Sequence, residues 1–316
     1  MGDNNSGFGL SRTAKDLLSG TTGGIAQVLV GQPLDRIKVN LQTAPQGTYT
    51  GMVDCASKLV KRDGVRGLYA GTLMPLLGVG ACVSVQFSVV EAVKRSFASS
   101  NAKRAGATSS EALSGVGAKA YPLSSAQLYS AGVAAGLANS FLAAPIEHIR
   151  IRLQLQTDGA FRGPVGCAKA IVSSNGVPGL FRGLVPTLVR EGHGMGMYFL
   201  IYEAVVGYKL RKDNLSRAEL PSLWAMLGGA TSGPLLWLAV YPVDVLKTVW
   251  TTQPLDPAQR KYSSLAACAK SIYAQGGWRG FFRGLGPTLT RAPISNAATF
   301  VAYEWAARNL EGYVRE

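Results

Sequence analysis

The sequence contains few of the residues that catalysis or metal binding requires. Only two histidines, His148 and His193, are present among its 316 residues, and none of its four cysteines forms a C-x-x-C pair. No phosphate-binding P-loop, nucleophilic triad or dinucleotide-binding glycine motif is found. These absences argue against an enzyme, a metal site, a cofactor and a disulfide-stabilised scaffold.

Charged residues are also scarce. They make up 16% of the chain, against about 25% in typical soluble proteins, whereas hydrophobic residues make up 47%. The formal net charge of +14 would by itself suit nucleic acid or an anionic membrane surface. Because the charge density is low and many of the 38 glycines lie inside apolar runs, the composition favours a membrane protein.

A basic protein that binds nucleic acid or the membrane surface is the alternative from a different class. In such a protein, aromatic residues should alternate with bases on exposed faces. Here the aromatic residues lie within apolar segments, so we expect no nucleic-acid partner.

What the sequence does contain is an element repeated three times. Each copy has two glycines four residues apart, a proline nine residues after the second glycine, an acid two residues after the proline and a base five residues after it. The prolines are Pro33, Pro145 and Pro242, the acids are Asp35, Glu147 and Asp244, and the bases are Lys38, Arg150 and Lys247. A second element ends in a glycine, at Gly71, Gly183 and Gly284. Fixed offsets that recur three times indicate three structural repeats.

Each repeat contains two apolar segments of roughly 25 residues, enough to cross a hydrocarbon core of about 30 Å as tilted or kinked helices. Between them, a stretch such as MVDCASKLVKRDG predicts a short amphipathic helix on the membrane surface. We therefore predict an all-α membrane protein of three tandem repeats. The predicted divisions are an N-terminal tail (1–14), repeat 1 (15–97), a polar loop (98–124), repeat 2 (125–212), a loop (213–220) and repeat 3 (221–310).

Charges inside a membrane span are costly and therefore point to function. Arg190 and Arg291 both lie seven residues after a repeat glycine, at equivalent depths, whereas the first repeat has Gly78 there. Glu191 follows Arg190, and His193 lies three residues after Arg190. Because an asymmetric solute requires asymmetric charges, these positions predict a substrate-binding site. Structural pairing of Arg190 and Glu191 with other helices, and a structural role for His193, are the alternatives.

The proline-acid-base element resembles the signature of the mitochondrial carrier family, and the resemblance extends from about Lys15 to Arg308. It implies a multi-pass protein of the mitochondrial inner membrane, with six transmembrane helices around a pseudo-threefold axis and a short matrix helix in each repeat. It also implies a matrix gate, in which the acid of one repeat pairs with the base of the next and glutamines brace the pairs. The implied pairs are Asp35 with Arg150, Glu147 with Lys247 and Asp244 with Lys38, and the implied braces are Gln42 and Gln154.

The resemblance also implies a second gate, on the cytoplasmic side, where this sequence departs from the family pattern. Glu91, Glu203 and Glu304 occupy the acid positions, but only Glu91 keeps its base, Lys94. We therefore expect a weak cytoplasmic gate, with one or two ion pairs at most.

Glycines near the short helices are the positions where the resemblance implies contact with a lipid, cardiolipin. They are Gly51, Gly71, Gly163, Gly183 and Gly284. The runs Phe181-Arg182-Gly183 and Phe282-Arg283-Gly284 would suit anionic headgroups near helix N-termini, and a plain interfacial anchor is the alternative.

The Arg190-Glu191 pair, with Arg291 two predicted spans later, resembles carriers of amino acids and carnitine. Glu191 would hold an α-ammonium group, and the arginines would hold carboxylates. Two arginines against one glutamate favour glutamate as the solute, moved by alternating access in a monomer. A carnitine/acylcarnitine or ornithine/arginine exchanger of the same fold is one alternative, and a carrier-like protein that acts by proton leak or scaffolding is another.

Overall fold

The computed structural model describes residues 11–104, 123–156, 159–215 and 219–311. Within these residues the chain forms nine α-helices, two short 3-10 helices and no strand. Six α-helices are long: α1 (Arg12–Thr43), α3 (Leu73–Arg104), α6 (Ser125–Leu155), α8 (Leu184–Lys212), α9 (Ser222–Thr251) and α11 (Leu285–Glu311). Three are short: α2 (Met52–Gly67), α7 (Gly163–Asn175) and α10 (Leu265–Gly280). The 3-10 helices are η1 (Val177–Phe181) and η3 (Pro257–Gln259).

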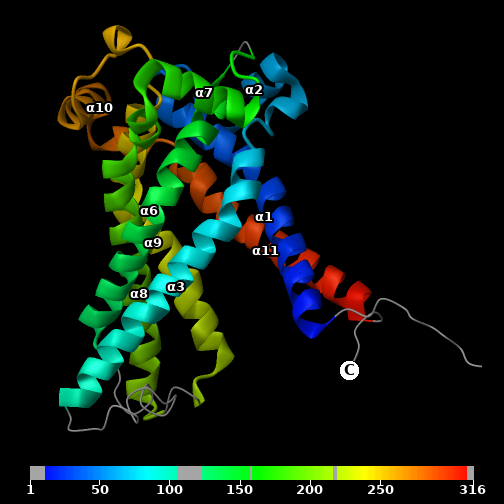
Figure 1. The fold of residues 1–316 in the computed structure, drawn as a ribbon, viewed down its shortest axis with the longest axis vertical. Coiled ribbons are helices and arrows are strands. Elements are labelled where there is room, and N and C mark those ends of the chain that lie inside the picture. The colour runs from blue at the N-terminus through cyan, green and yellow to red at the C-terminus, as the bar shows by residue number, and fades with distance from the viewer. Residues whose placement is uncertain (1–10, 105–122, 157–158, 216–218, 312–316) are drawn as a thin grey trace, which may run out of the picture.

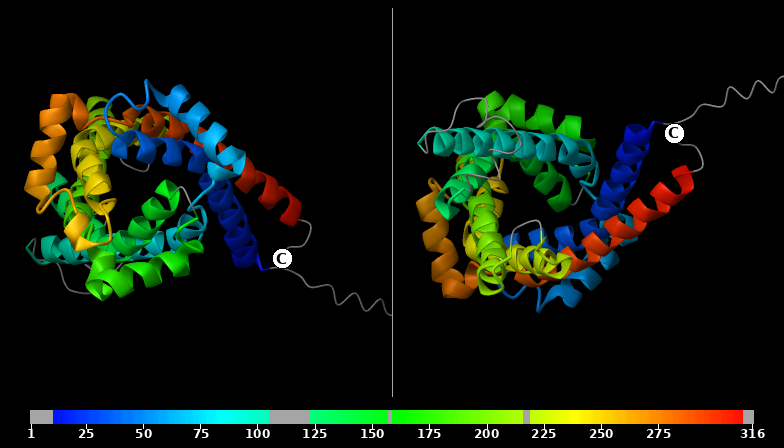
Figure 2. Two further views of the ribbon diagram at one scale, coloured as in Figure 1. Left: turned by 90° about the horizontal axis from the view of Figure 1, so that it is seen from above. Right: turned by 90° about the horizontal axis from the view of Figure 1, so that it is seen from below.

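The long helices form one bundle, which is narrow at the end that carries the short helices and wide at the other end (Figure 1). Seen along its length, the bundle surrounds a central axis, and the short helices lie around the narrow end (Figure 2). The most extensive packing is that of α1 against α11 and of α6 against α8. The predicted order, in which each of three repeats has two long tilted helices and a short helix between them, is confirmed.

Two of the long helices, α3 and α9, contain an apolar stretch long enough to cross a membrane by length and composition. The first helix of every repeat also continues through its motif proline, which lies inside α1, α6 or α9. A proline removes one backbone hydrogen bond and bends a helix. The acid and the base that follow each proline line a common cavity, described below.

Helix α2 is amphipathic, as predicted, and each of the three short helices carries one buried cysteine. Cys55, Cys167 and Cys268 are completely buried, and the thiol of Cys55 lies 3.9 Å from the backbone oxygen of Ile37 in the first helix of its repeat. Burial raises the pKa of each of these three thiols to about 11. They act as small packing residues.

One predicted boundary differs from the structure. Helix α3 continues through Arg104, seven residues into the predicted polar loop 98–124. Ala98 and Ala102, one turn apart on this extension, are buried, and Asn101 exchanges two side-chain hydrogen bonds with Gln127 of α6. The small and polar residues that indicated a loop therefore form a helical contact. Residues 105–122, the rest of that loop, and residues 1–10 of the predicted tail lie outside the described residues.

Paired glycines bring two backbones together in the second repeat. A Cβ atom at Gly136 would overlap the backbone oxygen of Glu191, and one at Gly132 would lie 2.7 Å from that of Met195. Helices α6 and α8 thus touch through their backbones, as small residues four apart permit. The same spacing in the first repeat does not bring a second backbone close to Gly24, where an added Cβ would meet no atom within 4 Å.

The glycines that end the second element lie at the narrow end, where one repeat contacts the next. We call each of these three contacts a seam. An added Cβ would lie 3.0 Å from the Arg150 oxygen at Gly71 and 3.0 Å from the Lys38 oxygen at Gly284, and 2.5 Å from Thr251 Cγ2 at Gly183. Each glycine therefore contacts the first helix of the next repeat in cyclic order. Gly71 and Gly284 also have positive φ angles of 79° and 81°, which glycine adopts without strain.

The residue before each of these glycines differs from seam to seam. Arg283 donates from Nη2 to the backbone oxygen of Ala44, 3.0 Å away, near the end of α1. The guanidinium of Arg182 stacks 4.8 Å from the ring of Trp250 on α9, and the backbone oxygen of Arg182 accepts a hydrogen bond from the indole N–H of Trp250 at 3.0 Å. Ala70 has no side chain that reaches the next repeat, and its backbone oxygen accepts a hydrogen bond from Gln32 of its own repeat.

Candidate functional site

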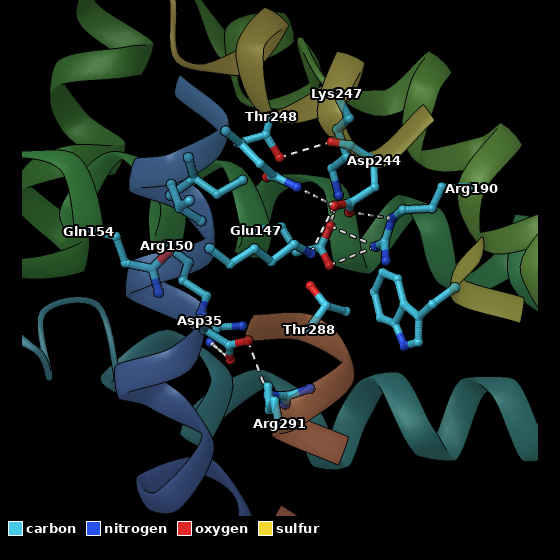
Figure 3. A pocket seen from close by; sticks show the side chains of 15 residues that line it. Asp35, Glu147, Arg150, Gln154, Arg190, Asp244, Lys247, Thr248, Thr288 and Arg291 are labelled. Atoms are coloured by element: carbon cyan, nitrogen blue, oxygen red, sulfur yellow. Dashed lines mark hydrogen bonds and ion pairs between the residues drawn. The ribbon is translucent and has the colours of Figure 1, made fainter. Parts of the chain in front are cut away.

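A polar cavity of about 210 Å³ lies among α1, α6, α8, α9 and α11 (Figure 3). Its lining includes three carboxylates, Asp35, Glu147 and Asp244, and five bases, Lys38, Arg150, Arg190, Lys247 and Arg291. Five bases against three acids leave two positive charges in excess, so the cavity as a whole attracts an anionic group.

The structure brings together the three acid–base pairs that the family resemblance implied. Lys38 Nζ lies 2.8 Å from Asp244 Oδ2, and Arg150 Nη2 lies 2.5 Å from Asp35 Oδ2. Lys247 pairs with Glu147. These pairs join α9 to α1, α1 to α6 and α6 to α9, so they close a ring around the bundle axis. We call these six residues the ion-pair ring.

One of the two predicted glutamine braces contacts the ion-pair ring. Gln42 donates from Nε2 to Asp244 Oδ2 at 3.0 Å and to the hydroxyl of Tyr241 at 3.2 Å. Gln154 lines the cavity, but its buried Nε2 has no hydrogen-bond partner among the described residues. Gln32 takes part instead, because its Oε1 accepts from Arg150 Nη2 at 2.8 Å.

Sequence reasoning missed Gln32 although a signal was present. Gln32 directly precedes Pro33, where the other repeats have Ala144 and Tyr241. An amide at one of three equivalent positions is the same kind of asymmetry that singled out Arg190. Gln32 is fully buried, so both polar groups of its amide need hydrogen-bond partners. Its oxygen accepts from Arg150, and its nitrogen donates to the backbone oxygen of Ala70.

Arg190 belongs to the same network as the ion-pair ring. Its Nη2 donates to both carboxylate oxygens of Glu147, at 2.8 and 3.0 Å, and its Nε lies 3.8 Å from Asp244 Oδ1 (Figure 3). The same Nη2 lies 2.5 Å from Glu191 Oε1. One arginine thus meets three carboxylates, and its side chain is only 10% exposed.

Arg291 approaches the ring from another helix, α11. Its Nε lies 3.0 Å from Asp35 Oδ1, while Arg150 holds the other oxygen of that carboxylate (Figure 3). The sequence analysis predicted a substrate site separate from the gate. Residue numbers give the depth of a residue along its helix, but they do not show how far its side chain reaches. In the structure, both predicted substrate arginines contact acids of the ion-pair ring.

The other predicted substrate residues lie around this network. Glu191 is held at Oε2 by Gln86 Nε2 of α3, at 3.3 Å, and by Asn139 Nδ2 of α6, at 3.1 Å. Gly78 is buried against Ile146, whose Cδ1 would lie 2.9 Å from an added Cβ. The side chain of His193 is exposed, and none of these three residues is among those that line the cavity.

His193 has a partner on the neighbouring helix. Its Nδ1 lies 2.8 Å from the Tyr129 hydroxyl, and the two rings meet edge to face with their centres 6.2 Å apart. This contact between α8 and α6 matches the structural alternative for His193.

A sequence profile described as "Mitochondrial carrier protein" matches residues 10–101, 121–213 and 219–314, one match for each repeat. The chain belongs to the mitochondrial carrier protein family. The predicted family is therefore confirmed, and with it the multi-pass carrier fold and the mitochondrial inner membrane as its location.

Three relatives illustrate where the carrier lies within this family. It is 47% identical over 305 residues to the mitochondrial glycine transporter YMC1 of Saccharomyces cerevisiae, covering 95% of this chain and 92% of that protein. It is 41% identical to the glutamate/glycine mitochondrial carrier ymc1 of Schizosaccharomyces pombe, covering 95% and 96%. It is 38% identical to the mitochondrial basic amino acids transporter of Bos taurus, covering 91% and 89%.

At the wide end of the carrier, the acids predicted to form the cytoplasmic gate lie far along the second helices. Glu91 pairs with Lys94 at 3.2 Å, and Glu304 pairs with Arg308 at 3.1 Å, in each case within one helix. Glu203 lies at the equivalent position of α8. An ion pair between Lys15 and Glu311 joins α1 to α11. The gate role of Glu91, Lys94, Glu203 and Glu304 stays a prediction.

Proposed function

We propose that this carrier moves an amino acid across the mitochondrial inner membrane by alternating access, with glutamate favoured and glycine second. The observation that carries this proposal is the position of the two arginines and Glu191. Arg190 on α8 and Arg291 on α11 both line the cavity, and Glu191 lies directly beside Arg190. A cationic and an anionic group of one small solute would find partners within this arrangement.

The excess of two positive charges around the cavity supports glutamate over a basic amino acid. Glutamate has two carboxylates, one for each arginine, and an ammonium group for Glu191. Glycine has a single carboxylate and would engage only one arginine. Arginine or ornithine would bring a second cation, which the five bases would repel. The relatives named for glycine and glutamate transport agree with this order.

The contacts of the two arginines suggest how the solute would open the gate. Arg190 holds Glu147 and Arg291 holds Asp35, so a solute carboxylate on either arginine competes with an acid of the ion-pair ring. A buried ion pair gains little net free energy, because the cost of desolvation offsets most of the attraction. The ring would then close the matrix side when empty and open when the solute stabilises the rearranged state.

The remaining partners follow from the same fold. We expect the carrier to act as a monomer without a catalytic step or cofactor, and an anionic lipid, cardiolipin by family resemblance, to contact the ends of the short helices. Gly51 and Gly163 support this, because Gly51 directly precedes α2, Gly163 is the first residue of α7, and neither has an atom within 4 Å of an added Cβ. Mass measurement of the purified carrier by light scattering, with and without cardiolipin, tests both expectations.

The test of the main proposal is uptake of labelled glutamate, glycine, arginine and carnitine into proteoliposomes, with and without the same solute inside. Because Arg291 is assigned to the second carboxylate, Arg291→Ala should reduce glutamate uptake by about ten-fold or more and glycine uptake much less. Arg279→Ala, at an exposed arginine of α10, is the matched control.

Selective uptake of arginine or carnitine by the wild type would replace glutamate with that solute. An activity that survives Glu191→Gln unchanged for every solute would instead indicate proton leak or scaffolding. Equal loss of glutamate and glycine uptake in Arg291→Ala would contradict the assignment of Arg291.

A further inference from the structure

Glu191 is restrained from three helices at once. Its Oε2 accepts hydrogen bonds from Gln86 on α3 and Asn139 on α6, and its Oε1 faces Arg190 on its own helix. Both amides are neutral donors, so they fix the orientation of the carboxylate without cancelling its charge. Because Arg190 lines the cavity, the carboxylate of Glu191 is fixed in one orientation directly beside a cavity residue.

The position of Asn139 follows from the close contact of α6 and α8. Gly136 packs against the backbone of Glu191, and Asn139 lies three residues later on the same helix. The short interaxial distance lets an asparagine side chain reach Glu191. Asn139 is only 3% exposed, and its Oδ1 is buried with no donor among the described residues. The amide therefore donates to Glu191 and leaves an acceptor unfilled next to it.

Gln86 is the amide without a counterpart among the repeats. Fifteen residues after the repeat glycine, repeat 1 has Gln86, where the others have Tyr198 and Thr299. Six residues before the motif proline, repeat 2 has Asn139, where repeat 1 has another amide, Gln27, and repeat 3 has Leu236. The two amides that hold Glu191 therefore come from different repeats, and one of them breaks the repeat symmetry fully.

We propose that Asn139 and Gln86 are positioning residues that make this site selective for a primary ammonium group. This inference rests on the proposed amino-acid transport. With Glu191 held in one orientation, an ammonium group donates to its carboxylate and supplies the donor that Asn139 Oδ1 lacks. A trimethylammonium group has no N–H, so it gains the charge attraction but neither hydrogen bond.

The experiment compares Asn139→Leu and Gln86→Leu with the wild type in proteoliposomes. The readouts are the KM and maximal rate for labelled glycine and the competition by unlabelled glycine against N,N,N-trimethylglycine. We expect KM for glycine to rise by about ten-fold in each variant, because a charge-assisted hydrogen bond is lost. The maximal rate should change little, and the preference for glycine over its trimethyl analogue should fall by a similar factor.

Ser140→Ala is the matched control. Ser140 is the next residue along α6 and is fully buried, and its hydroxyl donates to the backbone oxygen of Gly136. No hydrogen bond joins Ser140 to Glu191, so the Ser140→Ala variant should keep the wild-type KM for glycine and the wild-type preference for glycine over its trimethyl analogue. Thermal unfolding in detergent identifies a variant that has not folded, and if Asn139→Leu fails this check, Gln86→Leu decides, because Gln86 is only half-buried.

An unchanged preference between glycine and its trimethyl analogue, in a folded variant, would overturn the proposal. So would an equal loss of affinity for both compounds, since a merely structural role predicts that result. These outcomes differ from a failure of amino-acid transport itself, in which neither glycine nor glutamate enters with the wild type and Glu191→Gln changes nothing.

Discussion

Glu147 offers the sharpest test of the ion-pair ring, because it is shared between Lys247 of the ring and Arg190 of the proposed solute site. Glu147→Gln keeps the shape of the side chain and removes its charge. Arg190 retains Glu191 and Asp244 nearby, but the ammonium group of Lys247, whose side chain is 3% exposed, loses its acid partner. A buried charge left unpaired costs about 3–5 kcal/mol, so we expect a loss near the lower end of that range.

The second half of the test removes both charges. In Glu147→Gln with Lys247→Met, no unpaired ammonium group is left in the protein interior, so most of the loss should be recovered. The expected coupling free energy between the two substitutions is at least about 2 kcal/mol. The free energy of unfolding, measured by denaturant titration in mild detergent micelles, gives all four corners of the cycle. If the two losses simply add, Lys247 and Glu147 are not coupled, and the reasoning about the ring fails.

Two further predictions concern reactivity and packing. At pH 7.5, N-ethylmaleimide should label Cys82, which is half-buried on α3, well before the fully buried cysteines. Burial holds the pKa of the buried thiols at about 11, so they stay protonated at pH 7.5. Peptide mass spectrometry measures the order of labelling, and early labelling of any buried cysteine contradicts the prediction. The buried cysteines are Cys55, Cys167 and Cys268. Gly136→Ala should lower the free energy of unfolding by about 1–3 kcal/mol, because the added Cβ overlaps the Glu191 backbone. Gly24→Ala, in open space on α1, should leave the free energy of unfolding unchanged. Equal unfolding midpoints for the two variants would refute this difference.

Much of the architecture could be predicted from spacing alone. The three prolines, with an acid and a base at fixed offsets, identified the repeats. Which acid pairs with which base came from the family resemblance, and the ion pairs of Asp35, Glu147 and Asp244 agree with it. A repeated motif constrains three positions at once, so agreement among the copies substitutes for an alignment. The extension of α3 to Arg104 was missed because composition describes solubility, whereas the contact of Asn101 with Gln127 depends on tertiary packing.

The site was harder to predict than the fold for a geometric reason. Arg190 and Arg291 were identified from their depth, but an arginine side chain reaches several ångströms along the axis, far enough to contact Glu147 or Asp35. Gln86 was missed although it breaks the repeat symmetry, because the search for the substrate site compared only the charged residues of the repeats. Asn139 has an amide counterpart in Gln27, so its contact with Glu191 depends on the packing of α6 against α8 and not on asymmetry.

The three seams between repeats at the narrow end are held by different numbers of contacts, so we expect them to open in a fixed order. Arg283 and Arg182 tie two of the seams to the next repeat, whereas Ala70 leaves the seam between repeats 1 and 2 with the Asp35–Arg150 pair and its glutamine. That pair is also the one whose acid Arg291 contacts. Three ion pairs fastened alike would part in random order. Here the least fastened pair is also one that the solute can reach, so we expect entry to the matrix to begin between α1 and α6.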